Sequence, residues 1–156
     1  MKKIKILALI VAVVMLLMTS CSLFGGVGSE GEVTVVVENT DGSYDVFSVD
    51  LEKVENKSEG AKGVLQYLSE RNGDKLYVEM TDGIYGAYVS AIGNIKESFT
   101  DNAYVMVYTS VETDSYEGAP TVDYKGVTLY QSGFGISDMK VDSGSVILFR
   151  LEVYAY

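Results

Sequence analysis

Only one stretch of the 156-residue chain has the apolar spacing of an amphipathic helix, and this constrains the fold more than any other feature. Within residues 58–76, Val64, Leu65 and Leu68 fall at i, i+1 and i+4, which places them on one helical face. The pair Asn72-Gly73 predicts where the helix ends, because these residues readily adopt the left-handed conformation that terminates helices. We therefore expect a single main helix.

The rest of the chain consists of short runs rich in β-branched and aromatic residues, separated by turn residues. The first two runs are separated by Asp41-Gly42, which predicts a hairpin. Six or seven strands with one helix inserted after the first hairpin indicate an α+β fold, a β-grasp-like mixed sheet with one main helix packed on one face. The expected strands lie within residues 32–40, 44–54, 76–80, 85–92, 102–113, 124–133 and 143–156.

The N-terminus has the layout of a secretory signal. Lys2, Lys3 and Lys5 precede an uninterrupted apolar run, Ile6–Met18, which is shorter than the roughly 20 residues of a membrane span. The run ends in "LMTSC", and Cys21 is the single cysteine of the chain. This ending resembles the lipobox of bacterial lipoproteins, in which the signal is removed before a cysteine that then carries a diacylglyceryl group.

We accordingly expect residues 1–20 to be a lipoprotein signal peptide and Cys21 to be the lipidation site. The alternative is an ordinary secretory signal that leaves Cys21 free. Lipidation would hold the protein at the extracytoplasmic face of a bacterial cell membrane. Residues 21–32, rich in glycine and serine, would form a flexible tether, and residues 33–156 would form one domain without any internal disulfide.

The charge of the chain excludes several partners. Removal of the signal takes away three lysines and no acid, so the net charge moves from −10 to −13, with 9 basic residues against 22 acidic ones. Such a surface repels nucleic acid and anionic headgroups, so we expect no nucleic-acid partner. Contact with the membrane is expected through the lipid on Cys21 and not through charge.

The residue types also argue against catalysis. The chain has no histidine and one cysteine, so Ser–His and Cys–His catalysis and the usual zinc sites are excluded. The pairs Asp50/Glu52 and Glu112/Asp114 are expected on solvated strand faces, and no acidic segment has EF-hand spacing. We expect no enzyme activity, no metal and no resident cofactor.

Tyrosine is the unusual component, with twelve residues against five phenylalanines. Tyrosines can fill the edge of a core, or they can form an apolar surface that also offers hydroxyl groups. Tyr85 and Tyr88 lie three apart on an expected strand and would face opposite sides. The candidate ligand-binding residues are Tyr85, Tyr88, Tyr130, Gln131, Phe134 and Gly135.

Three phrases in order resemble the transcobalamin-like C-terminal domain, which closes vertebrate cobalamin carriers and occurs in bacterial surface lipoproteins. They are "GAKGVLQYLSERNG", "YGAYVSAIGNI" and "GISDMKVDSGSVILFRLEVY", and the resemblance covers about residues 33–154. It implies a ligand-facing loop in "LYQSGFGISD" and a corrinoid as a candidate ligand. This chain has no tryptophan where the family usually has one, and we expect no counterpart in it of the helical domain that completes the carriers' pocket.

Two functions follow from these observations. The first is a lipid-anchored cell-surface protein whose non-catalytic domain docks a protein or another cell-envelope partner. The second is binding of a small planar ligand, such as a corrinoid, by the aromatic and glycine-rich loop. An enzyme ranks third.

Overall fold

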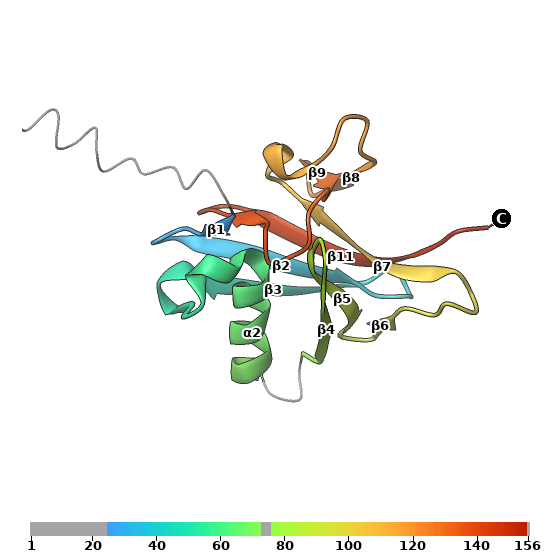
Figure 1. Ribbon diagram of the computed structural model, residues 1–156, viewed down its shortest axis with the longest axis horizontal. Coiled ribbons are helices and arrows are strands. Elements are labelled where there is room, and N and C mark those ends of the chain that lie inside the picture. The colour runs from blue at the N-terminus through green and yellow to red at the C-terminus, as the bar shows by residue number, and fades with distance from the viewer. Residues whose placement is uncertain (1–24, 73–75, 156) are drawn as a thin grey trace, which may run out of the picture.

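A computed structural model describes residues 25–72 and 76–155 (Figure 1). Its main sheet has six strands in the order β3-β2-β11-β7-β9-β8, and a smaller sheet has the order β4-β5-β6. The strands are β1 Gly26–Val27, β2 Glu32–Glu38, β3 Tyr44–Asp50, β4 Val78–Gly83, β5 Gly86–Ile92, β6 Ile95–Lys96, β7 Ala103–Thr109, β8 Thr121–Tyr124, β9 Val127–Gln131, β10 Lys140–Val141 and β11 Val146–Val153. The helices are α2 Gly60–Asn72 and the short 3-10 helices η1 Leu51–Lys53, η2 Lys57–Glu59 and η4 Glu112–Asp114.

The main sheet is mixed. Strand β2 runs parallel to β11 and antiparallel to β3, and β11 is also antiparallel to β7. This places the first hairpin beside the last strand, with α2 crossing one face of the sheet (Figure 1). The predicted α+β, β-grasp-like architecture is confirmed.

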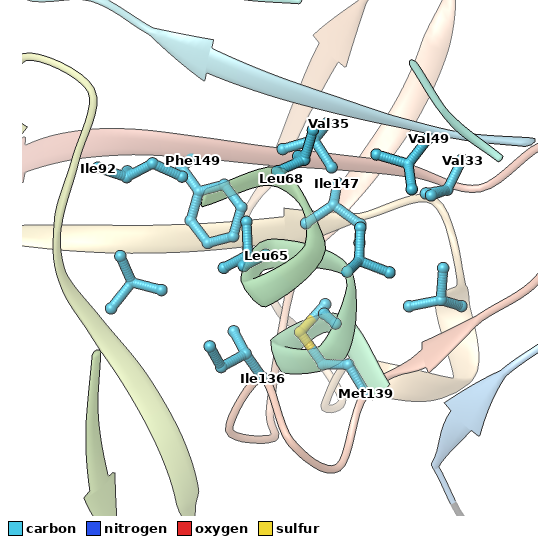
Figure 2. Close-up of a cluster of buried hydrophobic side chains, with 14 of the residues drawn as sticks. Val33, Val35, Val49, Leu65, Leu68, Ile92, Ile136, Met139, Ile147 and Phe149 are labelled. Carbon is cyan, nitrogen blue, oxygen red and sulfur yellow. The ribbon is translucent and has the colours of Figure 1, made fainter. Parts of the chain in front are cut away.

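The principal core lies between α2 and the sheet. Leu65 and Leu68 of α2 are buried beside Val35, Ile147 and Phe149 of the two central parallel strands (Figure 2). Alternate residues of β2 and β11 point to this face, as the two-residue period of a strand requires. The predicted helical stripe is therefore confirmed. The helix ends at Asn72, and Gly73 lies outside the described residues.

The expected strand of residues 44–54 is wrong in its last part. Strand β3 ends at Asp50, whose carboxylate accepts a hydrogen bond from the backbone N–H of Glu52 (3.0 Å). This capping bond starts η1 and turns Leu51 into the core. The hairpin turn before β3 lies where Asp41-Gly42 predicts it, and the Asp41 carboxylate accepts the N–H of Ser43 (2.9 Å).

The β4–β5 hairpin turns later than expected. Strand β4 continues through Asp82 to Gly83, and the turn consists of Ile84 and Tyr85. The local Asp-Gly signal is overridden because Asp82 pairs with Ala87 across the hairpin and Gly83 pairs with Gly86. Tyr85 therefore belongs to the turn and not to strand β5.

A second, smaller core lies on the other face of the sheet. The β8–β9 hairpin curls over this face (Figure 1), and Tyr108, Tyr124 and Leu129 are buried there with Val36 and Leu148. The rings of Tyr124 and Tyr44 meet edge-to-face with centroids 5.3 Å apart. Since Tyr44 lies on the opposite edge strand, β3, the sheet curls far enough for side chains of its two edge strands to meet. Among the tyrosines that the structure describes, Tyr108 and Tyr124 are thus buried core residues.

Part of the segment predicted as a flexible tether is paired with the rest of the domain. Gly26–Val27 forms strand β1, which pairs in parallel with Lys140–Val141. The N–H of Gly28 also donates to the Val141 carbonyl (2.7 Å). The glycines that suggest flexibility here permit close packing, because a Cβ on Gly25 would lie 2.2 Å from the Asp138 carbonyl oxygen.

The predicted signal peptide and Cys21 lie outside the described residues. Within residues 25–72 and 76–155, no helix is long and apolar enough to cross a membrane.

Candidate functional site

The segment between β9 and β10 is held against the β4–β5 hairpin by backbone hydrogen bonds. The N–H of Gly135 donates to the Tyr85 carbonyl (3.1 Å), and that of Ile136 donates to the Ala87 carbonyl (2.7 Å). The N–H of Ala87 in turn donates to the Ser137 hydroxyl (3.0 Å). These bonds bring the predicted ligand-facing loop beside the strand that carries Tyr88.

This approach depends on a glycine at position 135. A Cβ there would lie 2.6 Å from the Tyr85 carbonyl oxygen and 2.7 Å from backbone atoms of Gly86. Real Cβ atoms do not approach backbone that closely, so any side chain at this position would push the loop away from the hairpin.

A small apolar cavity of about 50 Å³ opens where this loop meets strands β5 and β7, and we call it the aromatic groove. Tyr88 and Phe134, which are 45% and 49% exposed, border it, and Phe149 belongs to its buried lining. Whole small-molecule pockets are typically about 300–1,000 Å³. The groove can therefore take one side chain or the edge of a ring. Its lining is Ala87, Tyr88, Val89, Val105, Val107, Phe134, Gly135, Ile136 and Phe149.

Phe134 is held half-exposed by its own loop. The Ser132 hydroxyl accepts a hydrogen bond from the N–H of Phe134 (3.1 Å) and donates one to the Phe134 carbonyl (3.0 Å). This short turn fixes the backbone, so the ring stands over the groove instead of entering the core.

The six predicted site residues fall into two groups. Tyr85, Tyr88, Phe134 and Gly135 lie together at the loop and hairpin. Tyr130 instead lines a separate, open depression of about 430 Å³ near Tyr116. Gln131 is buried and accepts a hydrogen bond from the Tyr116 hydroxyl (3.0 Å). The curl of β9 toward the second core separates the last two residues from the groove.

Two residues of this region escaped the sequence prediction. Ile84, beside Tyr85, is 92% exposed, and the signal that could have revealed it is an apolar pair at a turn between two glycines. Residues 112–114 form η4 instead of the predicted strand, and Asp114 is buried there instead of lying on a solvated face.

Asp114 forms hydrogen bonds with both ends of the segment between β9 and β10. Its carboxylate accepts the N–H of Lys140 (2.6 Å), and its carbonyl accepts the N–H of Gly133 (2.8 Å). Burial raises the pKa of this carboxyl, and the hydrogen bond from Lys140 opposes that effect. Asp114 thus positions the loop that carries Phe134.

Asp114→Ala is expected to lower the free energy of unfolding by about 1–3 kcal/mol, because the partly buried N–H of Lys140 loses its acceptor. Asp114→Asn retains an oxygen acceptor and serves as the matched variant. The pKa of Asp114 is higher in the folded state than its usual value of 3.8, so around and above pH 3.8 the native state binds more protons than the unfolded state. The wild-type carboxyl therefore lowers the stability of the fold as pH rises from 3.8 through the raised pKa. The stability of Asp114→Asn relative to wild type should therefore increase with pH from acid to neutral. Urea unfolding at several pH values checks this, and an unchanged or falling difference contradicts it.

A further pocket of about 300 Å³ lies at the end of β11 beside Arg150. The Arg150 Nε lies 3.6 Å from a Glu38 carboxylate oxygen and 3.7 Å from one of Glu152. Because two carboxylates flank one guanidinium, the pocket offers no excess positive charge to an anion. Among the residues that the structure describes, no group of three or more acidic, histidine or cysteine side chains could hold a metal ion.

Fold and site together define a class of protein: a small α+β domain of β-grasp type with an apolar, aromatic-bordered groove beside a glycine-dependent loop. No family model matches the sequence. No curated protein matches it either.

Solved structures do share the fold. A protein from Ruminococcus gnavus ATCC 29149, described as a candidate metal-binding protein, has a TM-score of 0.55 at 16% identity, covering 81% of this chain and all of its own. Haptocorrin in complex with Cbi has a TM-score of 0.55 at 14% identity, covering 88% of this chain. The match spans 28% of the haptocorrin chain, so this protein corresponds to about a quarter of it. At these identities the comparisons establish the fold alone.

Proposed function

We propose that this protein is a lipid-anchored, non-catalytic binding protein of a bacterial cell envelope, and a divergent member of the transcobalamin-like C-terminal domain family. Family membership is supported by three sequence phrases in order and by a fold shared with haptocorrin. Anchoring is supported by the signal-like N-terminus that ends at the single cysteine, Cys21.

The observation that carries the binding function is the aromatic groove. Tyr88 is the one titratable side chain among the nine residues of its lining, so the groove suits recognition by apolar burial and not proton transfer. Tyr88 and Phe134 present large ring surfaces at its border, and aromatic anchors of this kind dominate binding energies at protein interfaces. The favoured occupant is one apolar side chain of a protein or envelope partner.

The second candidate is a small planar ligand such as a corrinoid. It is favoured by the two half-exposed rings of Tyr88 and Phe134, and by the haptocorrin complex with Cbi. A groove of about 50 Å³ cannot enclose such a ligand. This chain would therefore supply one face of the site, and a second protein would cover the ligand.

We expect a photoreactive benzoylphenylalanine at position 88 to form an adduct of higher mass when cells are irradiated. The matched control is position 77, because Tyr77 is also exposed but precedes β4 at the end of the hairpin remote from the groove. Adding Phe134→Ala should reduce the adduct on the order of tenfold, as expected when an interface anchor worth about 1.4 kcal/mol is lost. Equal adducts at 88 and 77, or none at either, would exclude docking at the groove.

The ligand alternative is tested by titrating the protein with cobalamin and cobinamide up to high micromolar concentrations. Binding should change the visible spectrum of the corrinoid, and Tyr88→Ala should weaken it while Tyr130→Ala, in the separate depression, should not. No spectral shift and no heat would rule out corrinoids.

A further inference from the structure

The β4–β5 turn exposes apolar side chains to an unusual degree. Ile84 is 92% exposed and Tyr85 is 82% exposed, the two highest values among the large hydrophobic residues that the structure describes. Tight hairpin turns normally use asparagine, aspartate or glycine, which tolerate the backbone geometry and water. Gly83 and Gly86 flank this turn, so its geometry does not require a large apolar pair at the tip.

This turn lies next to the point where the described chain begins. Asp138 contacts both places: its carbonyl would lie 2.2 Å from a Cβ on Gly25, and its carboxylate would lie 2.7 Å from a Cβ on Gly86. The six residues from Gly135 to Lys140 join the two, because Gly135 binds the Tyr85 carbonyl and Lys140 pairs with Gly26. In Figure 1 this segment runs between β1 and the turn that joins β4 to β5.

The distance from the turn to a lipid on Cys21 is short. Gly25 lies four positions after Cys21, and a fully extended chain covers at most about 3.6 Å per position, or about 14 Å in all. With so short a connection to the lipid, the domain is held close to the bilayer. Its surface around Gly25, including the turn beside it, is drawn onto the lipid headgroups.

We propose that Ile84 and Tyr85 insert into the interface of the same bilayer that anchors Cys21, so that the domain is docked on the membrane in one orientation. This inference rests on the lipid anchoring in the proposed function. Tyrosine favours the membrane interface, where its ring is in the apolar layer and its hydroxyl is hydrated, and isoleucine favours the hydrocarbon side. The short connection to Cys21 keeps the turn at a high effective concentration near the lipid, so even a weak affinity of the turn for the bilayer is enough to dock the domain.

The charges near the turn determine which lipids favour docking. Asp82 precedes the turn and is paired with Lys62 (3.0 Å), while Asp138 is exposed beside Gly86. With a net charge of −13 after signal removal, the protein gains nothing from anionic headgroups. Insertion should therefore be driven by apolar contact and be strongest in zwitterionic bilayers. The aromatic groove, whose loop contacts the same turn, would then face a membrane-proximal partner.

The test uses the absence of tryptophan from the chain, which makes a single introduced indole the only one that fluoresces. Full-length protein carrying Tyr85→Trp is recovered from the membrane fraction and reconstituted into phosphatidylcholine vesicles, with and without phosphatidylcholine brominated on its acyl chains. We expect the indole at position 85 to show blue-shifted emission, quenching by the brominated lipid and protection from aqueous iodide. Adding Ile84→Asp should reduce the quenching by brominated lipid.

The control variant is Tyr77→Trp. It places the indole before β4, whose six residues span about 20 Å between position 77 and the turn. The emission of this variant should show no blue shift, no quenching by brominated lipid and no protection from iodide.

The outcomes separate the two proposals. Protein that carries the diacylglyceryl mass on Cys21 and floats with vesicles, but leaves the indole at position 85 as open to iodide as the one at position 77, overturns the docking and leaves the anchor standing. Protection from iodide without quenching by brominated lipid means that a second protein molecule covers the turn, which also overturns docking on lipid. A protein that lacks the lipid mass and does not float contradicts the anchor, and docking with it.

Discussion

Replacing Phe149 with alanine is expected to lower the free energy of unfolding by about 3–5 kcal/mol, the usual effect of truncating a fully buried phenylalanine. Phe149 lies on the central strand β11, is completely buried, and packs in the core shared by α2 and the sheet (Figure 2). It also belongs to the lining of the aromatic groove, so the substitution should enlarge that cavity. Urea unfolding followed by circular dichroism measures the change.

The matched control is Phe99→Ala. Phe99 is 71% exposed and lies outside both cores, so its truncation should change stability by no more than about 0.5 kcal/mol. Similar losses for the two variants would mean that β11 does not hold the central place in the core.

Gly135→Ala is expected to lower the free energy of unfolding by about 1–3 kcal/mol, as overpacking against fixed atoms does. The added methyl would meet the Tyr85 carbonyl oxygen at 2.6 Å and the Gly86 backbone at 2.7 Å. The loop must move away, and the hydrogen bonds from Gly135 and Ile136 to the hairpin should lengthen. Amide hydrogen exchange at position 136 should then be faster than in wild type, and benzoylphenylalanine adducts at position 88 should decrease.

Gly133→Ala, two residues earlier in the same loop, is the control. Its methyl would meet a Tyr116 ring carbon at 3.4 Å, which is ordinary contact, so stability and exchange should change little. If both variants behave alike, the close approach at Gly135 does not organise the loop.

Local patterns were sufficient for the secondary structure and the fold class. The stripe of Val64, Leu65 and Leu68 identified the helix, because helical period is set by neighbours in the chain. Alternation and Asp41-Gly42 identified the first hairpin for the same reason. The α+β prediction followed from the order of these elements.

Local patterns misplaced three features that depend on distant residues. The β4–β5 turn moved to Ile84 and Tyr85 because cross-strand pairing outweighed the Asp-Gly signal. The glycine-rich segment at Gly26–Val27 is ordered because it pairs with Lys140–Val141, more than one hundred residues away. Asp114 is buried because the loop it fastens folds over it.

For the candidate site too, some features follow from local sequence and others only from tertiary packing. The sequence by itself determined the residue types of the loop, aromatic and glycine-rich in a chain without histidine, and a role in binding was predicted from them. Only the tertiary structure decided that Tyr88, Phe134 and Gly135 share one groove while Tyr130 and Gln131 face elsewhere. The physical reason is the curl of the sheet, which is set by packing within the second core and by the contact of its Tyr124 with Tyr44, and which leaves no trace in the spacing of neighbouring residues.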